Sequence, residues 1–143
     1  MSDSAGKTIA LLLVDHGSRY QAANDMLADV ASLTKQMTGL ERVYVCHMEL
    51  AEPSIAQGFA QAVQDGATAV VVHPYFLSPG RHSQSDIPRM VAEAAQGFPG
   101  VEFCVTQPLG VHPKIVEVIL ERSGIPLDFA LRAKSKRIEF RPA

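Results

Sequence analysis

Hydrophobic residues along the chain follow two alternating patterns. Short apolar runs, typical of strands that are covered on both faces, occupy residues 9–14, 43–46, 69–72 and 101–105. After each run, apolar residues recur three and four positions apart, which is the pattern of an amphipathic helix. The helices predicted from this spacing lie within residues 23–37, 53–63, 87–95 and 115–119.

Two of the predicted helices carry boundary signals. Gly39 is expected to end the first helix, because glycine readily takes the left-handed conformation of a C-cap. Pro53, which follows Glu52, is expected to open the second helix in its first turn, where a missing backbone N–H costs nothing.

The order of strand and helix, repeated four times with short connections, predicts an α/β fold. Parallel strands joined by right-handed helical crossovers place helices on both faces of one sheet. We therefore expect a three-layer α/β/α domain on a four-stranded parallel sheet, a flavodoxin-like half. Ligands of such sheets bind at the carboxyl ends of the strands, so the candidate chemistry should lie in the segments that follow each strand.

Composition narrows the class of protein. The 143 residues suffice for one domain, and 47% hydrophobic with 20% charged residues is ordinary for a globular protein. The longest apolar run is too short to cross a bilayer, and residues 1–7 lack the apolar stretch of a signal peptide. A cytoplasmic protein with no membrane partner is expected. The formal net charge of −2 gives no electrostatic reason to expect a nucleic-acid partner.

The two cysteines and the C-terminal segment add further expectations. Cys46 and Cys104 each lie in an apolar run, which favours two buried thiols over a disulfide. A Cys-x-x-Cys pair, as in zinc knuckles and iron–sulfur proteins, does not occur. Residues 125–143 hold five basic and two acidic residues. We interpret them as a basic extension of a domain at 1–124, either solvated or in contact with an acidic ligand or partner subunit.

All the histidines of the chain stand near the ends of predicted strands: His16, His47, His73, His82 and His112. Imidazole is both a proton carrier near neutral pH and a metal ligand. For His47, His73 and His112, a hydrogen bond to a neighbouring group is an equally good interpretation.

Two of the histidines have surroundings that favour function. Gly17 lets the backbone turn sharply beside His16, and Arg19 adds a cation close by. Before His82, Pro79 and Gly80 are expected to shape an irregular loop, and such loops on a rigid sheet often carry function. Two imidazoles are too few for a closed structural zinc site, and they suit a site that binds a metal briefly and releases it.

Short motifs stand at these strand ends in a fixed order. They are Val14-Asp-His-Gly-Ser-Arg19 with Asn24, His47-Met-Glu-Leu-Ala-Glu-Pro-Ser-Ile55, Phe76-Leu-Ser-Pro-Gly-Arg-His82, Asp86-Ile-Pro88, and Pro108-Leu-Gly110 with His112. Together they resemble the single-domain class II metal chelatases of the CbiX/SirB family, over nearly the whole chain before the basic extension. The resemblance implies an enzyme that inserts Fe²⁺ or Co²⁺ into sirohydrochlorin, in sirohaem or cobalamin biosynthesis. The divalent metal would be a substrate, and no permanently bound cofactor is implied.

The resemblance also implies roles for individual residues. His16 would bind the metal and accept a pyrrole proton, His82 would be the second metal ligand, and Glu52 would be an acid that contacts the substrate. The loop around the macrocycle would consist of Leu77, Ser78, Pro79, Gly80, Arg81 and His82. Because larger relatives contain two such domains in tandem, the resemblance implies a homodimer.

The chemistry of metal insertion agrees with these residue types. Neutral imidazoles replace water on Fe²⁺, Co²⁺ or Ni²⁺ without blocking the release of the metal. A general base increases the reaction rate by about 10²–10⁴-fold. Guanidinium groups bind carboxylates bidentately, so Arg19, Arg81 and Arg89 either pair with the carboxylates of the macrocycle or remain solvated. Glu52 either acts on the substrate or stabilises the start of a helix.

The same residues bear on other possible functions. A histidine phosphotransferase would need an arginine directly before the histidine, where Asp15 stands. Nucleotide binding lacks a Gly-x-Gly-x-x-Gly or Walker motif. A non-catalytic metal or tetrapyrrole carrier of the same fold, and nickel insertion, stay open as alternatives. The motifs are similar to those of plastid sirohydrochlorin ferrochelatases. Two features of those proteins are missing here: the cysteine-rich tail, and a second loop histidine, which is replaced within residues 83–85. Both departures weaken the case for iron over cobalt as the inserted metal.

Overall fold

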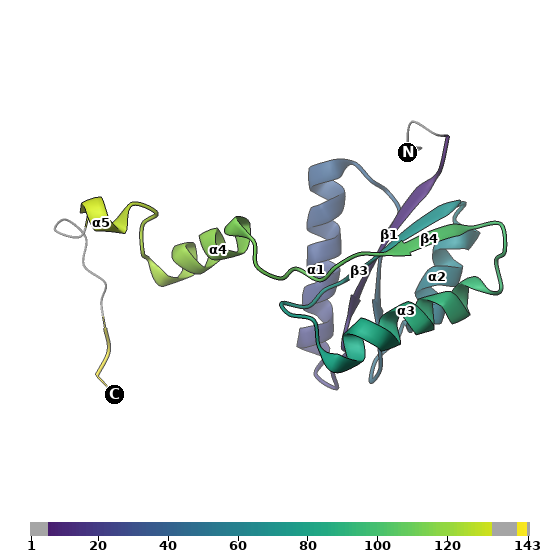
Figure 1. Cartoon of the computed structure of the whole chain (residues 1–143), viewed down its shortest axis with the longest axis horizontal. Helices are drawn as coiled ribbons and strands as arrows, with labels where there is room; N and C mark the ends of the chain where they lie inside the picture. The colour runs from purple at the N-terminus through teal and green to yellow at the C-terminus, as the bar shows by residue number, and fades with distance from the viewer. Residues whose placement is uncertain (1–5, 133–139, 143) are drawn as a thin grey trace. The chain divides into compact units, whose positions relative to one another are not determined.

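The computed structural model describes residues 6–132 and 140–142, and for residues 81–83, 131 and 132 it describes the backbone alone. Within these residues the elements are β1 (Ile9–Asp15), α1 (Gln21–Thr38), β2 (Val43–His47), α2 (Ile55–Gln64), β3 (Ala69–Pro74), α3 (Arg81–Ala95), β4 (Glu102–Val105), α4 (Pro113–Ser123) and α5 (Phe129–Arg132) (Figure 1). The predicted alternation of strands and helices is therefore confirmed.

The strands of the described part form one parallel sheet in the order β2-β1-β3-β4. On one face, Leu27 and Ala31 of α1 pack on Leu13 and Val43. On the other face, α2 and α3 cover a second set of strand residues, because side chains alternate between the two faces of a strand. That larger cluster includes Ala10, Leu12, Val14, Val72, Phe59, Ile87 and Val91. The predicted three-layer α/β/α architecture on a four-stranded parallel sheet is confirmed.

Two helix boundaries differ from the prediction. Helix α2 begins at Ile55 and is capped by Ser54, whose hydroxyl accepts the N–H of Gln57 while the Gln57 side chain accepts the N–H of Ser54. This reciprocal capping box satisfies two otherwise free donors, so the prediction that Pro53 opens the helix is wrong. Helix α3 begins at Arg81, several residues before the predicted start.

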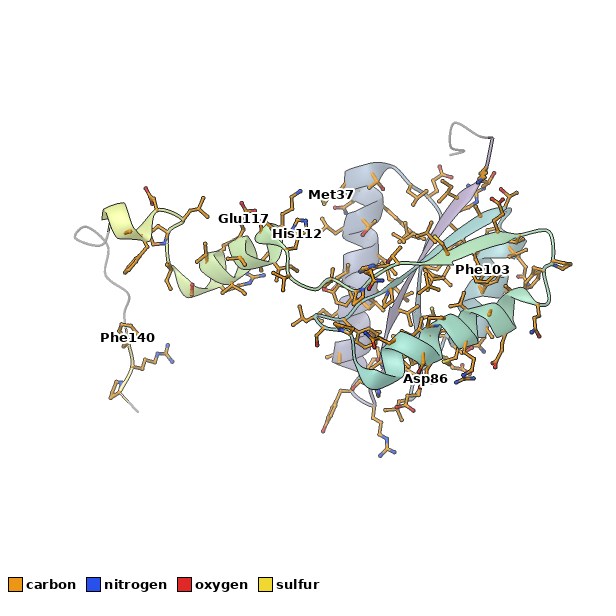
Figure 2. The ribbon with its side chains drawn as sticks, viewed as in Figure 1. Met37, Asp86, Phe103, His112, Glu117 and Phe140 are labelled. Atoms are coloured by element: carbon orange, nitrogen blue, oxygen red, sulfur yellow. The ribbon has the colours of Figure 1, made fainter. Side chains whose placement is uncertain are left out.

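The two cysteines have different environments. Cys46 is fully buried in the larger core cluster, as predicted, whereas Cys104 is exposed, and both thiols are free. The prediction of a buried Cys104 is wrong, because β4 is an edge strand that pairs only with β3 within the described sheet. Phe103, its neighbour on β4 (Figure 2), packs edge-on against Phe59 with ring centroids 6.3 Å apart.

Only one of the two thiols is expected to react in the folded protein. Burial, together with the negative charge of Asp15, raises the pKa of the Cys46 thiol to about 12. Because the thiolate is the reactive form, Cys46 should stay unmodified by a thiol-disulfide reagent at pH 8 until the chain is unfolded. Titration with such a reagent should give one fast thiol per native chain, and Cys104→Ser should remove it. Two fast thiols in the native protein would contradict the burial of Cys46.

The first compact unit of the chain ends at Gly110, and the second begins at Val111. In the second unit, the imidazole of His112 caps α4 by accepting the N–H of Lys114 at 3.1 Å. The domain boundary predicted after Gly124 stays a prediction, and the basic residues within 133–139 lie outside the described residues. None of the helices formed by the described residues has the length and hydropathy that a bilayer crossing requires.

Candidate functional site

The carboxyl ends of the parallel strands lie at one edge of the sheet. Strand β1 ends at Asp15, β2 at His47 and β3 at Pro74, and β1 lies between the other two. The turns that follow them therefore emerge side by side at this edge, which is where ligands of open parallel sheets bind. The segments that follow Asp15, His47 and Pro74 therefore begin at this edge.

The turns after β1 and β2 are joined by their backbones. The N–H of Met48 donates to the carbonyl of Asp15 at 3.0 Å, and the N–H of Glu49 donates to the carbonyl of His16 at 3.1 Å. Gly17 has a φ of +93°, and a Cβ atom added to it would lie 1.8 Å from the carbonyl oxygen of Glu49. Only a glycine lets the two turns approach this closely.

This approach brings the side chains of His16 and Glu49 together. Nε2 of His16 lies 3.3 Å from Oε1 of Glu49, and the two side chains are 57% and 59% exposed. An imidazole and a carboxylate from separate turns thus share an accessible position at the sheet edge. Glu49 was not predicted as a site residue. Hydrophobic periodicity gives no signal for it, because its contact with His16 follows from the pairing of Asp15 with His47 and from the hydrogen bond of the Glu49 N–H to the carbonyl of His16.

Glu52, the acid predicted to act with His16, has a different environment. It is exposed and, with Pro53, Gln57, Ala60 and others, lines a surface hollow beside α2. The role of Glu52 therefore stays a prediction, while Glu49 is the acid in contact with His16.

A buried amide fixes the turn that carries His16. Oδ1 of Asn24 accepts the N–H of Ser18 at 3.0 Å, and Nδ2 of Asn24 donates to the carbonyl of Ser18 at 2.8 Å. Asn24, on α1, is itself buried. The turn from His16 to the exposed Arg19 is thereby held against the first helix.

Replacing Asn24 by alanine is expected to destabilise the fold. The substitution leaves a backbone donor and acceptor of Ser18 without partners in a poorly solvated position, which costs about 1–3 kcal/mol. Urea denaturation measures the change in the free energy of unfolding. Gln21→Ala, which removes an exposed amide bonded to Asp25 on the same helix, is the control and should change stability by less than about 0.5 kcal/mol. Equal losses in both variants would contradict the anchoring role.

The turn after β3 is joined to the segment after β4. The N–H of Leu109 donates to the carbonyl of Phe76 at 2.9 Å, and the N–H of Gly110 donates to the carbonyl of Leu77 at 2.8 Å. The predicted loop residues Leu77, Ser78, Pro79 and Gly80 are exposed, and Pro79 borders a cavity of about 390 Å³ whose polar lining residues are Gln84, Thr106 and Gln107.

The predicted loop ends earlier than expected, because Arg81 and His82 form the first turn of α3. Their side chains lie outside the described part of the structure, so the convergence of His82 with His16 stays a prediction. Arg89, farther along α3, contacts Glu93 at 3.1 Å and Asp86 at 3.6 Å on its own helix (Asp86 is labelled in Figure 2). These contacts favour the interpretation of Arg89 as a solvated helix residue.

The remaining histidines have hydrogen-bond partners, as the alternative interpretation proposed. His112 caps α4, and Nδ1 of His73 lies 2.8 Å from Oγ1 of Thr106. Burial lowers the pKa of His73 below its usual value, which favours its neutral form. Nδ1 of His47 contacts Oδ1 of Asp15.

The described side chains contain no group of three or more histidine, cysteine, aspartate or glutamate residues arranged to hold a metal ion. The contact between His16 and Glu49 supplies two donors, one nitrogen and one oxygen. This is an open arrangement, able to take up an ion and to pass it on, rather than a closed structural site.

Comparison with known proteins identifies relatives of this chain. The CbiX family model matches residues 10–124. The chloroplastic sirohydrochlorin ferrochelatase of Arabidopsis thaliana is 43% identical over 122 residues, which cover 85% of this chain and 54% of that protein. The sirohydrochlorin cobaltochelatase of Methanopyrus kandleri is 29% identical over 134 residues, covering 80% of this chain and 94% of that protein.

A solved structure shares the fold. The sirohydrochlorin chelatase SirB from Bacillus subtilis subspecies spizizenii, in complex with cobalt, superposes with a TM-score of 0.75 at 31% identity, over 80% of this chain and 49% of SirB. The chain spans about half the length of SirB and of the Arabidopsis protein. The family match over residues 10–124, together with the sheet order, establishes that the chain belongs to the CbiX family.

Proposed function

We propose that this protein inserts a divalent metal, Fe²⁺ or Co²⁺, into sirohydrochlorin, in sirohaem or cobalamin biosynthesis. The observation that carries the proposal is the 3.3 Å separation of His16 Nε2 and Glu49 Oε1 at the carboxyl edge of the sheet. Relatives named sirohydrochlorin ferrochelatase and sirohydrochlorin cobaltochelatase, and a SirB structure in complex with cobalt, support the choice of substrates.

The separation of the two donor atoms suits one metal ion. Bonds from a divalent metal to imidazole nitrogen and carboxylate oxygen are about 2.0–2.2 Å long, so two adjacent ligands of one ion lie about 3 Å apart. His16 and Glu49 therefore need little rearrangement to bind the same ion. Both side chains are more than half exposed, which leaves the ion open to the incoming macrocycle. His82, at the start of α3, would be the second imidazole.

Insertion also requires that pyrrole protons leave as the metal enters the ring. The imidazole of His16 becomes free when it releases the metal, and it can then accept one of these protons at Nε2. Such general-base catalysis increases the rate of a reaction by about 10²–10⁴-fold. The nearby carboxylate of Glu49 stabilises the imidazolium that forms. Glu52, which lies in the same connection between β2 and α2, would contact the substrate.

The carboxylates of sirohydrochlorin need cationic and polar partners. Arg19 is exposed on the turn that carries His16, so its guanidinium group can reach a carboxylate at the rim of a macrocycle placed over the metal. Arg81 and residues 77–80 would enclose the opposite rim. Because the chain spans about half of SirB, we also propose that a second copy supplies the other half in a homodimer.

The two acids after β2 are expected to differ in their effects. Glu49→Gln keeps the shape of the side chain but removes the charge beside His16, so Co²⁺ affinity should fall by about 10-fold or more, as for loss of a ligand or its close support. Glu52→Gln should leave Co²⁺ affinity within about twofold. Titration of the purified protein with Co²⁺ alone measures both. The reverse order of effects would transfer the metal-binding role to Glu52.

Direct assay of insertion tests the function. Purified protein is mixed with excess sirohydrochlorin and Fe²⁺, Co²⁺ or Ni²⁺ under anaerobic conditions, and the absorption spectrum of the macrocycle is followed. We expect many turnovers per chain above the rate without protein, with Fe²⁺ or Co²⁺ preferred in direct competition. A change limited to one macrocycle per chain would indicate a carrier and refute the enzyme. A preference for Ni²⁺ would overturn the metal assignment.

A further inference from the structure

A buried polar pair stands at the ends of β1 and β2, one residue before His16 and two residues before Glu49, the two candidate metal ligands. Nδ1 of His47 contacts Oδ1 of Asp15, and the two residues are register partners in the sheet. Their side chains are 3% and 20% exposed. The preceding residues, Val14 and Cys46, are fully buried in the core. The pair therefore lies where apolar strand residues meet the polar edge of the sheet.

The stability of the fold alone does not explain such a pair. Removing a carboxylate and an imidazole from water carries a desolvation cost, and well-packed apolar residues of similar volume often give equal or greater stability. A satisfied buried contact does, however, restrict its neighbours to one geometry.

The backbone leads from the pair to the site. Asp15 directly precedes His16, and its carbonyl accepts the N–H of Met48, which directly precedes Glu49. The side-chain contact and the two backbone hydrogen bonds thus form three consecutive links between the turns. His16 and Glu49 are themselves too exposed to be held by packing, so their separation depends on these links.

We propose that Asp15 and His47 are positioning residues, which fix the separation of His16 and Glu49 so that both can bind one metal ion in transit. The inference rests on the proposed function in taking a divalent metal as substrate. It adds a requirement for metal binding beyond the metal ligands themselves: the buried contact between Asp15 and His47 must be intact.

The test measures Co²⁺ affinity without sirohydrochlorin. In the double variant Asp15→Val with His47→Leu, apolar side chains replace the buried pair, so the melting temperature should be equal or higher. Affinity for Co²⁺ should nevertheless fall about 10- to 100-fold, the range for loss of groups that orient metal ligands. The single variant His47→Asn keeps Asp15, and its amide nitrogen can occupy the position of Nδ1 and contact Asp15. This variant should therefore keep most of the Co²⁺ affinity of the parent protein. Unchanged affinity in the double variant would overturn the proposal.

Two further measurements separate a positioning role from a loss of affinity that any change at this edge of the sheet would cause: a control variant at another histidine, and the double variant made in a Glu49→Gln protein. His73 contacts Thr106 through Nδ1 at the neighbouring strand end, and His73→Leu should leave Co²⁺ affinity within about twofold. Because Asp15 and His47 act through Glu49, the double variant should cost less than threefold in a Glu49→Gln background, since coupled residues are non-additive. An equal cost in both backgrounds would assign the effect to the charge of Asp15 and overturn the proposal.

The two proposals fail in different ways. If the parent protein inserts metal but the pair variants bind Co²⁺ as it does, only the positioning role is lost. If Co²⁺ affinity depends on the pair but no insertion into sirohydrochlorin occurs, positioning stands and the chelatase function is lost.

Discussion

His16→Ala should abolish metal insertion while leaving the fold intact. The side chain is more than half exposed and its contact is with the equally exposed Glu49, so its removal opens no cavity in the core. The variant loses a metal ligand and a proton acceptor together. Loss of a general base alone costs about 10²–10⁴-fold, and we expect kcat/KM to fall at least into this range. The absorbance assay with sirohydrochlorin and Co²⁺ measures the rate, and circular dichroism and thermal unfolding check the fold.

The matched control for this variant is His73→Gln. His73 also stands at a strand end, but the hydrogen-bond partner of its imidazole is the hydroxyl of Thr106. The control should keep at least half of the parent activity. A folded His16→Ala protein with more than a tenth of the parent turnover would refute the assignment of His16 to the reaction.

The main features of the fold could be predicted because burial leaves a regular pattern in the sequence. The continuous apolar strands report burial on two faces, and they were placed correctly to within a few residues. Helix α3 carries this pattern only in part. Its second half buries Ile87, Val91 and Ala95, which reveal the helical period, whereas the polar run from Arg81 onward carries no such signal.

Features that depend on neighbours in the sheet could not be predicted. The apolar surroundings of Cys104 suggested burial, but its exposure depends on β4 being an edge strand. Glu49 meets His16 because β2 pairs with β1 in one particular register. Hydrophobic periodicity gives neither the strand order nor the register, so it could select the right segments of the site but not the acid that faces the histidine.

Gly17→Ala should disrupt the site without removing any of its chemical groups. The added Cβ would lie 1.8 Å from the carbonyl oxygen of Glu49 and 3.2 Å from Cβ of His47. The hydrogen bond from the N–H of Glu49 to the carbonyl of His16 holds the two turns at this distance. The methyl group must therefore push the turns apart, which separates the two candidate metal ligands. A displacement of about 1 Å at a reacting group can cost 10²-fold, and we expect insertion to fall at least that far.

The control separates this collision from the cost of the backbone conformation. Gly66 has a φ of +98°, close to the +93° of Gly17, but an added Cβ there would meet only the tip of Arg42, at 3.7 Å. Both alanine variants carry the left-handed penalty of about 1–3 kcal/mol, measurable by urea denaturation. Only Gly17→Ala should also lose Co²⁺ affinity and insertion, because only there does the side chain meet the backbone of the opposite turn. If the two variants lose equal stability and both keep their activity, the close approach of the turns has no part in holding the metal.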